Sequence, residues 1–205
     1  MLKKYVVEGK TEEENKNKFM EENNFASDEI IVIDILSDSS LFKGKKVTST
    51  FTSKSDLKKF IKEYLIELGK LMNLSINVEL RENEFGYNIQ LICENNSILI
   101  GKDGRTISSI QTLLRQTVEN ELKSSSIKIN IDAANYKEQK LKKLEREVKR
   151  IAKEVLSSKV DVSLDPMNSY ERRMIHNLID SYKDLTTESI GEGKERHVVI
   201  KYIGE

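Results

Sequence analysis

In this 205-residue sequence, a glycine-bounded tetrapeptide, Gly101-Lys102-Asp103-Gly104, is the first group of residues whose types and spacing suggest a binding chemistry. Two glycines three positions apart let the backbone turn sharply and approach a ligand without an intervening Cβ. Amides at the start of a following helix lack partners and attract an anion, and Lys102 and Arg105 add positive charge there. With the apolar shoulder at 98–100 offering a surface for a base, the pattern favours a sugar–phosphate backbone over a nucleoside triphosphate. A plain corner between two helices is the alternative.

Arg172 and His176 form a second group with a spacing that suggests binding. Residues four apart lie on one face of a helix, with about 5–6 Å between their Cβ atoms. The apolar residues of the same stretch fall on a different face, so we expect this pair to be exposed, with Arg173 adding charge beside it. An ordinary surface helix, in which His176 lies near Tyr170 or Asp180, is the alternative interpretation.

Other chemistries find little support in the residue types. One cysteine, Cys93, excludes an internal disulfide, and two histidines are too few for a histidine-built metal centre. No serine–histidine–aspartate order, HExxH motif or pair of carboxylates stands out. We therefore expect no catalytic residue, no metal and no cofactor, and we do not expect an enzyme. Cys93 lies on the apolar side of a strand pattern and is expected in the core.

Composition indicates a globular protein with an uneven charge distribution. Hydrophobic residues make up 38% of the chain, and the 34 basic residues balance the 34 acidic ones. The apolar runs are far shorter than the roughly 20 residues that span a bilayer, and no secretory signal follows the N-terminal methionine, which predicts a cytoplasmic protein. Residues 1–40 carry 5 basic and 10 acidic side chains, whereas residues 137–159 carry 9 and 4. A positive surface for a polyanion is compatible with this distribution, although such helices are often plain solvated faces.

Periodicity divides the elements that must position these motifs into three segments. Residues 1–52 predict a strand, a helix capped by Thr11 and two further strands, with a turn at 37–40. A short polar linker is expected at 53–56. Residues 55–134 predict the order α-β-β-α-α-β, because helical spacing, an alternating hairpin, the glycine motif, a second helical stripe and a last alternating run follow one another.

The last segment, residues 135–205, predicts the order α-β-α-β-β. Its elements are a long helix over about 137–157, a strand at 160–164, a helix from about 168 to 182 and extended runs at about 185–190 and 197–203. Arg172 and His176 lie on the second of these helices. The predicted fold class is therefore α+β, with three small domains at 1–52, 55–134 and 135–205.

These motifs resemble those of the bacterial Jag family, also called KhpB or EloR. Residues 98–114 resemble its type II KH domain, with the sequence Ile-Leu-Ile-Gly-Lys-Asp-Gly-Arg-Thr-Ile-Ser-Ser-Ile-Gln-Thr-Leu-Leu. Residues 166–177 resemble its R-three-H (Arg-x-x-x-His) domain, with the sequence Pro-Met-Asn-Ser-Tyr-Glu-Arg-Arg-Met-Ile-His-Asn, and residues 187–200 resemble the end of that domain. Residues 3–52 are similar to the Jag N-terminal domain, whose Gly-Phe-rich turn appears here at 40–44 without a following proline.

The resemblance implies a set of RNA-binding residues. A KH domain clamps about four backbone nucleotides through its GxxG loop. In the R-three-H domain the arginine–histidine pair is thought to bind the phosphate of a single strand, with an arginine of the closing loop nearby. The residues that match in this sequence are Ile100, Gly101, Lys102, Asp103, Gly104, Arg105, Arg172, Arg173, His176 and Arg196. Asp103 either places a carboxylate near the phosphates or caps the next helix.

The resemblance also implies a biological role. It predicts a cytoplasmic, RNA chaperone-like regulator that binds single-stranded RNA and is linked to cell elongation or division. Single-stranded DNA is a second candidate ligand of the last domain, and a small KH-domain protein or a second copy of the chain is a candidate partner. The competing hypothesis is a protein-interaction scaffold that docks through its acidic N-terminal domain, with nucleic-acid binding secondary.

Overall fold

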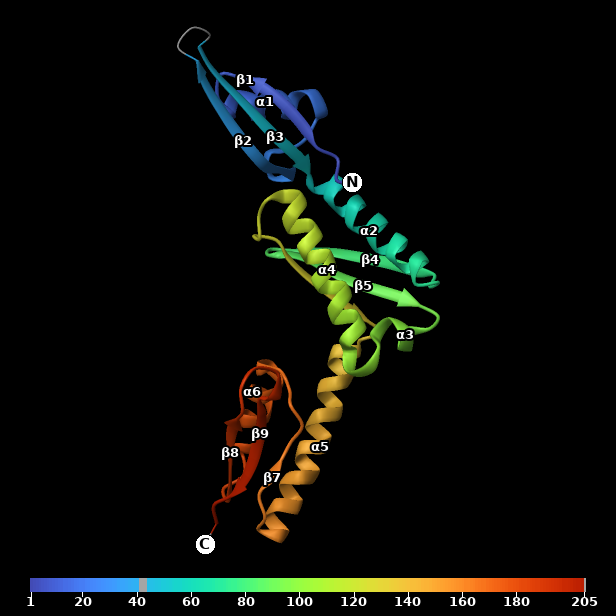
Figure 1. The fold of residues 1–205 in the computed structure, drawn as a ribbon, viewed down its shortest axis with the longest axis vertical. Coiled ribbons are helices and arrows are strands. Elements are labelled where there is room, and N and C mark those ends of the chain that lie inside the picture. Colours follow the sequence, from blue (N-terminus) through green and yellow to red (C-terminus); the bar gives the residue numbers. More distant parts are fainter. Residues whose placement is uncertain (41–43, 205) are drawn as a thin grey trace. The chain divides into compact units, whose positions relative to one another are not determined.

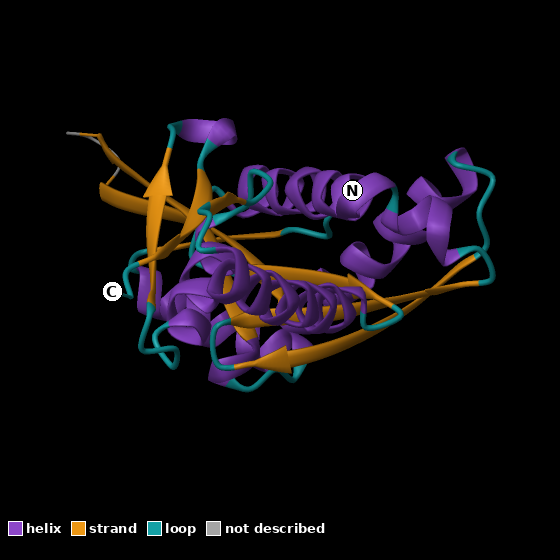
Figure 2. Cartoon of the chain, turned by 90° about the horizontal axis from the view of Figure 1, so that it is seen from below, coloured by secondary structure: helices purple, strands orange, loops and turns teal. Residues whose placement is uncertain are grey.

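The computed structural model describes residues 1–40 and 44–204, and the backbone alone of residues 38–40, 44 and 45. The chain folds into two compact units, Met1–Ala134 and Asn135–Glu205 (Figure 1). Both units combine helices with strands (Figure 2). In the described residues the strands form three three-stranded sheets. The fold class is therefore α+β, as the sequence predicted. Within the described ranges, every helix is too short or too polar to cross a membrane.

The N-terminal part of the first unit has the predicted order β-α-β-β. Its elements are β1 (Tyr5–Gly9), α1 (Glu12–Asn23), β2 (Ile30–Ser40) and β3 (Gly44–Ser53). Thr11 caps α1, because its side chain accepts a hydrogen bond from the amide of Glu14. The strands form an antiparallel sheet in the order β1-β3-β2. Phe19 of α1 stacks on Phe51 of β3 with ring centroids 5.1 Å apart, and this pair anchors the small core.

Two local predictions in this part were wrong. Residues 37–40, expected as a turn, continue strand β2 and pair with β3. The turn-like stretch at 40–44 contains residues 41–43, which lie outside the described residues. The linker expected at 53–56 is absent as a loop, because α2 (Lys54–Leu71) starts directly after β3. Ser53 ends the strand and caps the helix with its side chain.

The second part of the first unit has the predicted order α-β-β-α-α-β. After α2 come β4 (Ile76–Asn83), β5 (Gly86–Cys93), α3 (Asn96–Ile100), α4 (Arg105–Leu122) and β6 (Lys128–Ala133). The hairpin of β4 and β5 is antiparallel, and β6 joins β5 in parallel. Alternate residues of β5 and β6 are buried, so the helices cover one face of this sheet only. Cys93 is buried in that core, as expected.

Tyr87 and Phe85, the two aromatic residues near this hairpin, have different surroundings. Tyr87 is buried, and burial raises the pKa of its phenol to about 12. It is therefore a packing residue. Phe85 is exposed at the turn, where the ammonium of Lys128 lies 5.1 Å from the centre of its ring.

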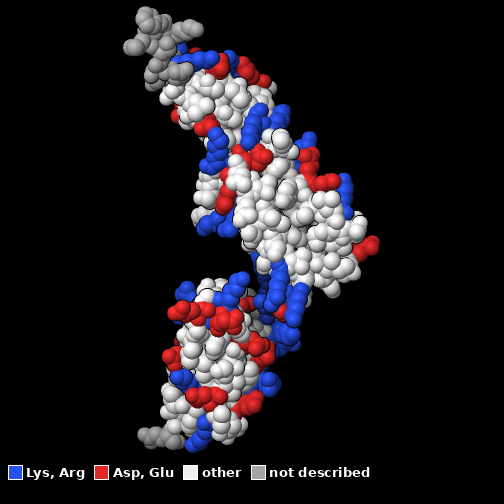
Figure 3. Space-filling view, in the orientation of Figure 1, with Lys and Arg blue, Asp and Glu red and all other residues white. Residues whose placement is uncertain are grey.

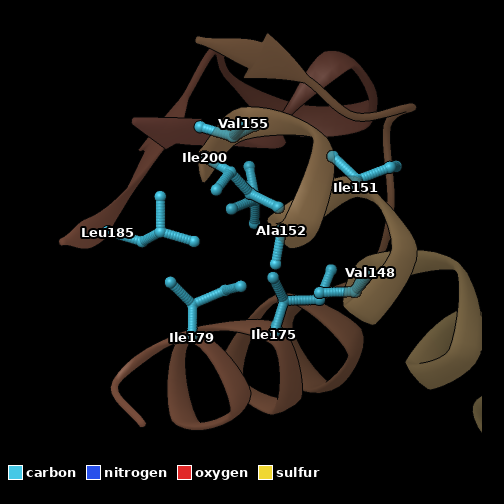
Figure 4. Packing of buried hydrophobic residues seen from close by; sticks show 9 residues of the cluster. Val148, Ile151, Ala152, Val155, Ile175, Ile179, Leu185 and Ile200 are labelled. Carbon is cyan, nitrogen blue, oxygen red and sulfur yellow. The ribbon is translucent and has the colours of Figure 1, made fainter. Parts of the chain in front are cut away.

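The second unit has the predicted order α-β-α-β-β. Its elements are α5 (Tyr136–Ser158), β7 (Val162–Ser163), α6 (Ser169–Ile179), β8 (Leu185–Ile190) and β9 (His197–Tyr202). The sheet is antiparallel, in the order β7-β9-β8. Figure 4 shows the core, where side chains of α5 and α6 converge with Leu185 and Ile200 of the sheet. This core fixes α6, and with it the arginine and histidine of the second motif.

The division into three domains stays a prediction. The break between residues 134 and 135 separates two compact units. The boundary between residues 52 and 55 lies within the first unit, where the last strand of one sheet leads directly into a helix.

Candidate nucleic-acid interface

The glycine loop connects α3 to α4 and depends on both glycines. Gly101 and Gly104 adopt positive φ angles of 72° and 81°, which glycine accepts without strain. An ideal Cβ on Gly101 would lie 2.0 Å from the hydroxyl oxygen of Thr106. The close approach of Gly101 to the start of α4 therefore excludes any side chain at this position. Asp103 also has a positive φ, 55°, as aspartate does more readily than most residues.

Several backbone amides of the loop already donate hydrogen bonds within the chain. Fewer amides are therefore left to bind an anion than the sequence predicted. The amide of Gly101 donates to the carbonyl of Ser97 at 2.9 Å, and that of Gly104 donates to the carbonyl of Gly101 at 3.3 Å. The amide of Arg105 donates to the carbonyl of Lys102. The glycine amides themselves are thus satisfied within the loop, and the amides of Lys102 and Asp103 are the candidates for contact with a ligand.

The side chains around the loop combine positive charge with an apolar surface. Lys102, Asp103 and Arg105 are exposed, and Ile100 is half-buried. Ile98, on α3, is also exposed and extends the apolar surface. Gly104 occupies the N-cap position of α4, so Asp103 does not cap that helix. The loop is accessible to a ligand, with one carboxylate among its cations.

The Arg172–His176 pair is less exposed than the sequence indicated. Both side chains are half-buried. The ring of His176 lies against strand β8, with Nδ1 2.6 Å from the hydroxyl oxygen of Thr187 and Nε2 2.9 Å from that of Ser189. Tyr170 and Asp180, the neighbours named in the alternative interpretation, do not hold the ring. A hydroxyl group can either donate or accept a hydrogen bond. Thr187 and Ser189 therefore fix the orientation of the imidazole ring in each of its protonation states.

One backbone residue, Met167, connects the two arginines of the second motif. The guanidinium of Arg172 donates from Nη1 to the carbonyl of Met167 at 2.9 Å. The amide of Met167 donates to the carbonyl of Arg196, the exposed arginine of the closing loop, at 3.2 Å. Arg173 is exposed one position further along α6. Arg172 and Arg196 therefore belong to one local cluster, and the remaining donors of the Arg172 fork can meet an anion.

Two polar contacts fix the N-terminus of α6 under this cluster. Asn168 and Glu171 form a capping box, in which each side chain accepts a hydrogen bond from the backbone amide of the other residue. Glu171 is buried and also pairs with Lys140 of α5, with Nζ and Oε1 2.8 Å apart. A buried carboxylate needs such partners. These contacts set the position at which Arg172 leaves the helix.

Sequence reasoning missed two residues of this cluster, Thr187 and Ser189. Thr187 and Ser189 alternate with exposed residues along β8, on the face that Leu185 contributes to the core. The sequence signal that could have revealed them is the presence of two hydroxyl residues at positions of β8 that face the core, where apolar residues are usual. Tyr170 has 66% of its surface exposed, one helical turn from Arg173. In the described part of the chain, no three histidine, cysteine or acidic side chains converge to hold a metal ion.

Comparisons with known families match both parts of this arrangement. Residues 58–131 match the KH domain of KhpA and KhpB, and residues 141–202 match the R-three-H domain. The fold and the two motifs define a protein that combines a KH domain with an R-three-H domain.

Curated relatives cover most of the chain. The RNA-binding protein KhpB of Clostridium symbiosum is 36% identical over 200 residues, which is 95% of this chain and 90% of that protein. The RNA-binding protein KhpB of Bacillus subtilis is 29% identical over 164 residues, or 79% of this chain and 78% of that protein. The RNA-binding protein KhpB of Lactiplantibacillus plantarum is 30% identical over 138 residues, 67% of this chain and 42% of that protein. The chain belongs to the KhpB (Jag) family.

Proposed function

We propose that this chain binds single-stranded RNA through two surfaces, the glycine loop at 101–104 and the cluster around Arg172 and His176. The KhpB relatives support RNA as the ligand, because their names describe them as RNA-binding proteins. The observation that carries the proposal is the link through Met167, whose carbonyl accepts a hydrogen bond from the guanidinium of Arg172 and whose amide donates one to the backbone carbonyl of Arg196.

In the glycine loop, the backbone and the side chains have separate roles. The amides of Lys102 and Asp103 and the side chains of Lys102 and Arg105 meet phosphates, which position the strand without reading its sequence. The apolar surface of Ile98 and Ile100 receives a base. The carboxylate of Asp103 repels a phosphate that lies too close, and so restricts the path of the strand across the loop.

In the second cluster, Arg172 supplies a planar fork for a phosphate and His176 supplies a ring held at fixed orientation by Thr187 and Ser189. Arg173 and Arg196 add positive charge. The two surfaces are on one chain, so binding at one raises the effective concentration of RNA at the other. Single-stranded DNA is also a ligand compatible with contacts that involve phosphates alone.

The cellular role rests on the family resemblance alone. We propose a cytoplasmic, RNA chaperone-like regulator with an influence on cell elongation or division. A small KH-domain protein or a second copy of the chain would be its protein partner. No catalytic step is part of this proposal.

A titration against a fluorescent single-stranded RNA across salt concentrations tests the proposal. Counterion release predicts that the logarithm of the affinity falls steeply and linearly with the logarithm of the salt concentration. Lys102→Asp and the pair Arg172→Ala with His176→Ala should each weaken binding, while Lys62→Ala, an exposed lysine on α2, serves as the control. An RNA affinity that is absent, or equal in the parent and both site variants, would contradict the proposal.

The scaffold hypothesis has one structural observation in its favour. Val6 and Leu36 have 64% and 63% of their surface exposed. They pair with Thr50 and Thr48 of β3, so they lie on the same uncovered face of the first sheet. A partner protein could cover this face. If the chain binds RNA weakly and without dependence on salt, docking through this face becomes the better explanation.

A further inference from the structure

Helix α5 carries six cations on the face turned away from the core. The core-facing residues of α5 are Val148, Ile151, Ala152 and Val155. At 100° per residue, five of the six cations lie within about 60° of the direction opposite to these core-facing residues. The sixth, Lys149, lies at the margin of this range. They are all exposed, and we call them the outer basic stripe: Lys142, Lys143, Arg146, Lys149, Arg150 and Lys153. Figure 3 shows the blue surface of lysine and arginine gathering over the first half of this helix.

Half of the outer basic stripe is neutralised by neighbouring acids, and half is not. Lys142 pairs with Glu138, Lys149 with Glu145 and Arg150 with Glu154, each four residues away. Among the residues that the structure describes, Lys143, Arg146 and Lys153 form no ion pair. The Nε of Arg146 donates a hydrogen bond to the carbonyl of Lys142, which is not an acid. These three cations are available to an external anion.

The spacing of the stripe is repulsive around Arg146. Arg146 has a like charge four residues away on both sides, in Lys142 and Arg150, and Lys153 has Lys149 four residues before it. Like charges at this spacing destabilise a helix.

We propose that the outer basic stripe is a third binding surface, which takes the phosphate backbone of single-stranded RNA without reading its bases. This deepens the proposed function and rests on it. The stripe from Lys143 to Lys153 extends over about 15 Å along the helix, long enough for several phosphates. A polyanion relieves the repulsion around Arg146, so RNA binding and helix stability become coupled at this residue.

The test compares two triple variants of the full chain with the parent. The stripe variant is Lys143→Gln, Arg146→Gln and Lys153→Gln. The matched control is Lys10→Gln, Lys18→Gln and Lys62→Gln, which changes the net charge equally at exposed lysines of the first unit. The probe is a labelled oligouridylate, titrated at several salt concentrations. The salt slope of the stripe variant should be smaller by roughly 2, about 0.7 for each lost phosphate contact, while the control keeps the parental slope.

A second measurement separates binding from folding. Arg146→Glu replaces two repulsive pairs by attractive ones, so its melting temperature without RNA should rise by about 2 °C while its RNA affinity falls. If both triple variants lose slope equally, or if the stripe variant retains the parental slope, the third surface does not exist. In those cases a continued loss of affinity in the Arg172/His176 variant would leave the proposed function standing. A parent chain that does not bind oligouridylate would instead contradict the proposed function itself.

Discussion

The imidazole of His176 and the hydroxyl of Thr187 lie 2.6 Å apart, across the space between α6 and the edge strand β8. Ser189 holds the second ring nitrogen from the same strand. The histidine is therefore fixed by residues that follow it by 11 and 13 positions. An ordinary surface histidine would have no such pair of partners.

Removing both hydroxyls should disorder the ring without destroying the domain. We expect the double variant Thr187→Val with Ser189→Ala to lose about 1–2 kcal/mol of unfolding free energy, because two half-buried hydrogen bonds are lost. RNA affinity should also fall, although the variant remains folded, because the ring of His176 is no longer held in place. Urea unfolding and RNA titration measure the two effects, and Thr187→Ser, which keeps the hydroxyl, should behave as the parent does. Unchanged affinity in the double variant would show that the orientation of His176 is irrelevant to binding.

The glycine loop should not tolerate a side chain at Gly101. Gly101 combines a φ of 72° with a ψ of −178°, a conformation that other residues adopt only with strain. In addition, a Cβ at this position would clash with Thr106. We expect Gly101→Ala to cost about 1–3 kcal/mol of unfolding free energy and to weaken RNA binding. Gly193→Ala is the control, since φ is also positive there but nothing lies within 4 Å of the added Cβ. Equal thermal stability of the two variants would contradict this explanation.

Glu82 should make stability depend on pH in the acid range. Hydrogen bonds from Lys58 and then Lys54 hold the pKa of its carboxyl below the ordinary value of 4.5. A lowered pKa in the folded state means that the stabilisation is present above the unfolded pKa and is lost as the pH falls through the folded one. The group is partly exposed, so the effect should be about 0.5 kcal/mol. Glu82→Gln should unfold with a smaller pH dependence than the parent in urea melts below the ordinary carboxyl pKa; an identical dependence would contradict the prediction.

Tyr170 should stack on a base of the bound strand. Its ring is exposed beside the cations of α6, and an aromatic side chain in such a position stacks on nucleobases of any identity. We expect Tyr170→Ala to weaken RNA binding by about 1–3 kcal/mol and to leave the melting temperature unchanged. Tyr170→Phe should retain the affinity, because it keeps the ring. If the phenylalanine variant binds as weakly as the alanine variant, the hydroxyl and not the ring makes the contact.

Periodicity was sufficient to predict the elements and their order. Alternation in β5 and helical spacing in α4 both reflect burial on one side, which is a local property of the sequence. The boundaries were harder. Ser37–Ser40 have the composition of a turn, but cross-strand pairing with β3 keeps them extended. The polar run at 53–56 has the composition of a linker, but Ser53 and Asp56 use their polarity to start α2.

The sequence names candidate site residues but does not give their geometry. The motif letters located Arg172 and His176, whereas the hydroxyls that hold the histidine come from a strand whose register the sequence does not specify. Likewise, the glycine spacing indicated a tight loop, but not that the amides of Gly101 and Gly104 would bond within it. Long-range pairing and internal hydrogen bonding decide which groups are left for a ligand.

Ser53 is at once the final residue of β3 and the cap of α2, with its hydroxyl bonded to Asp56, which also accepts a hydrogen bond from Tyr5 of β1. No loop separates the first sheet from α2, the helix in which the match to the KH domain begins. A truncation that starts at residue 54 would therefore remove the N-cap of α2 together with the first sheet.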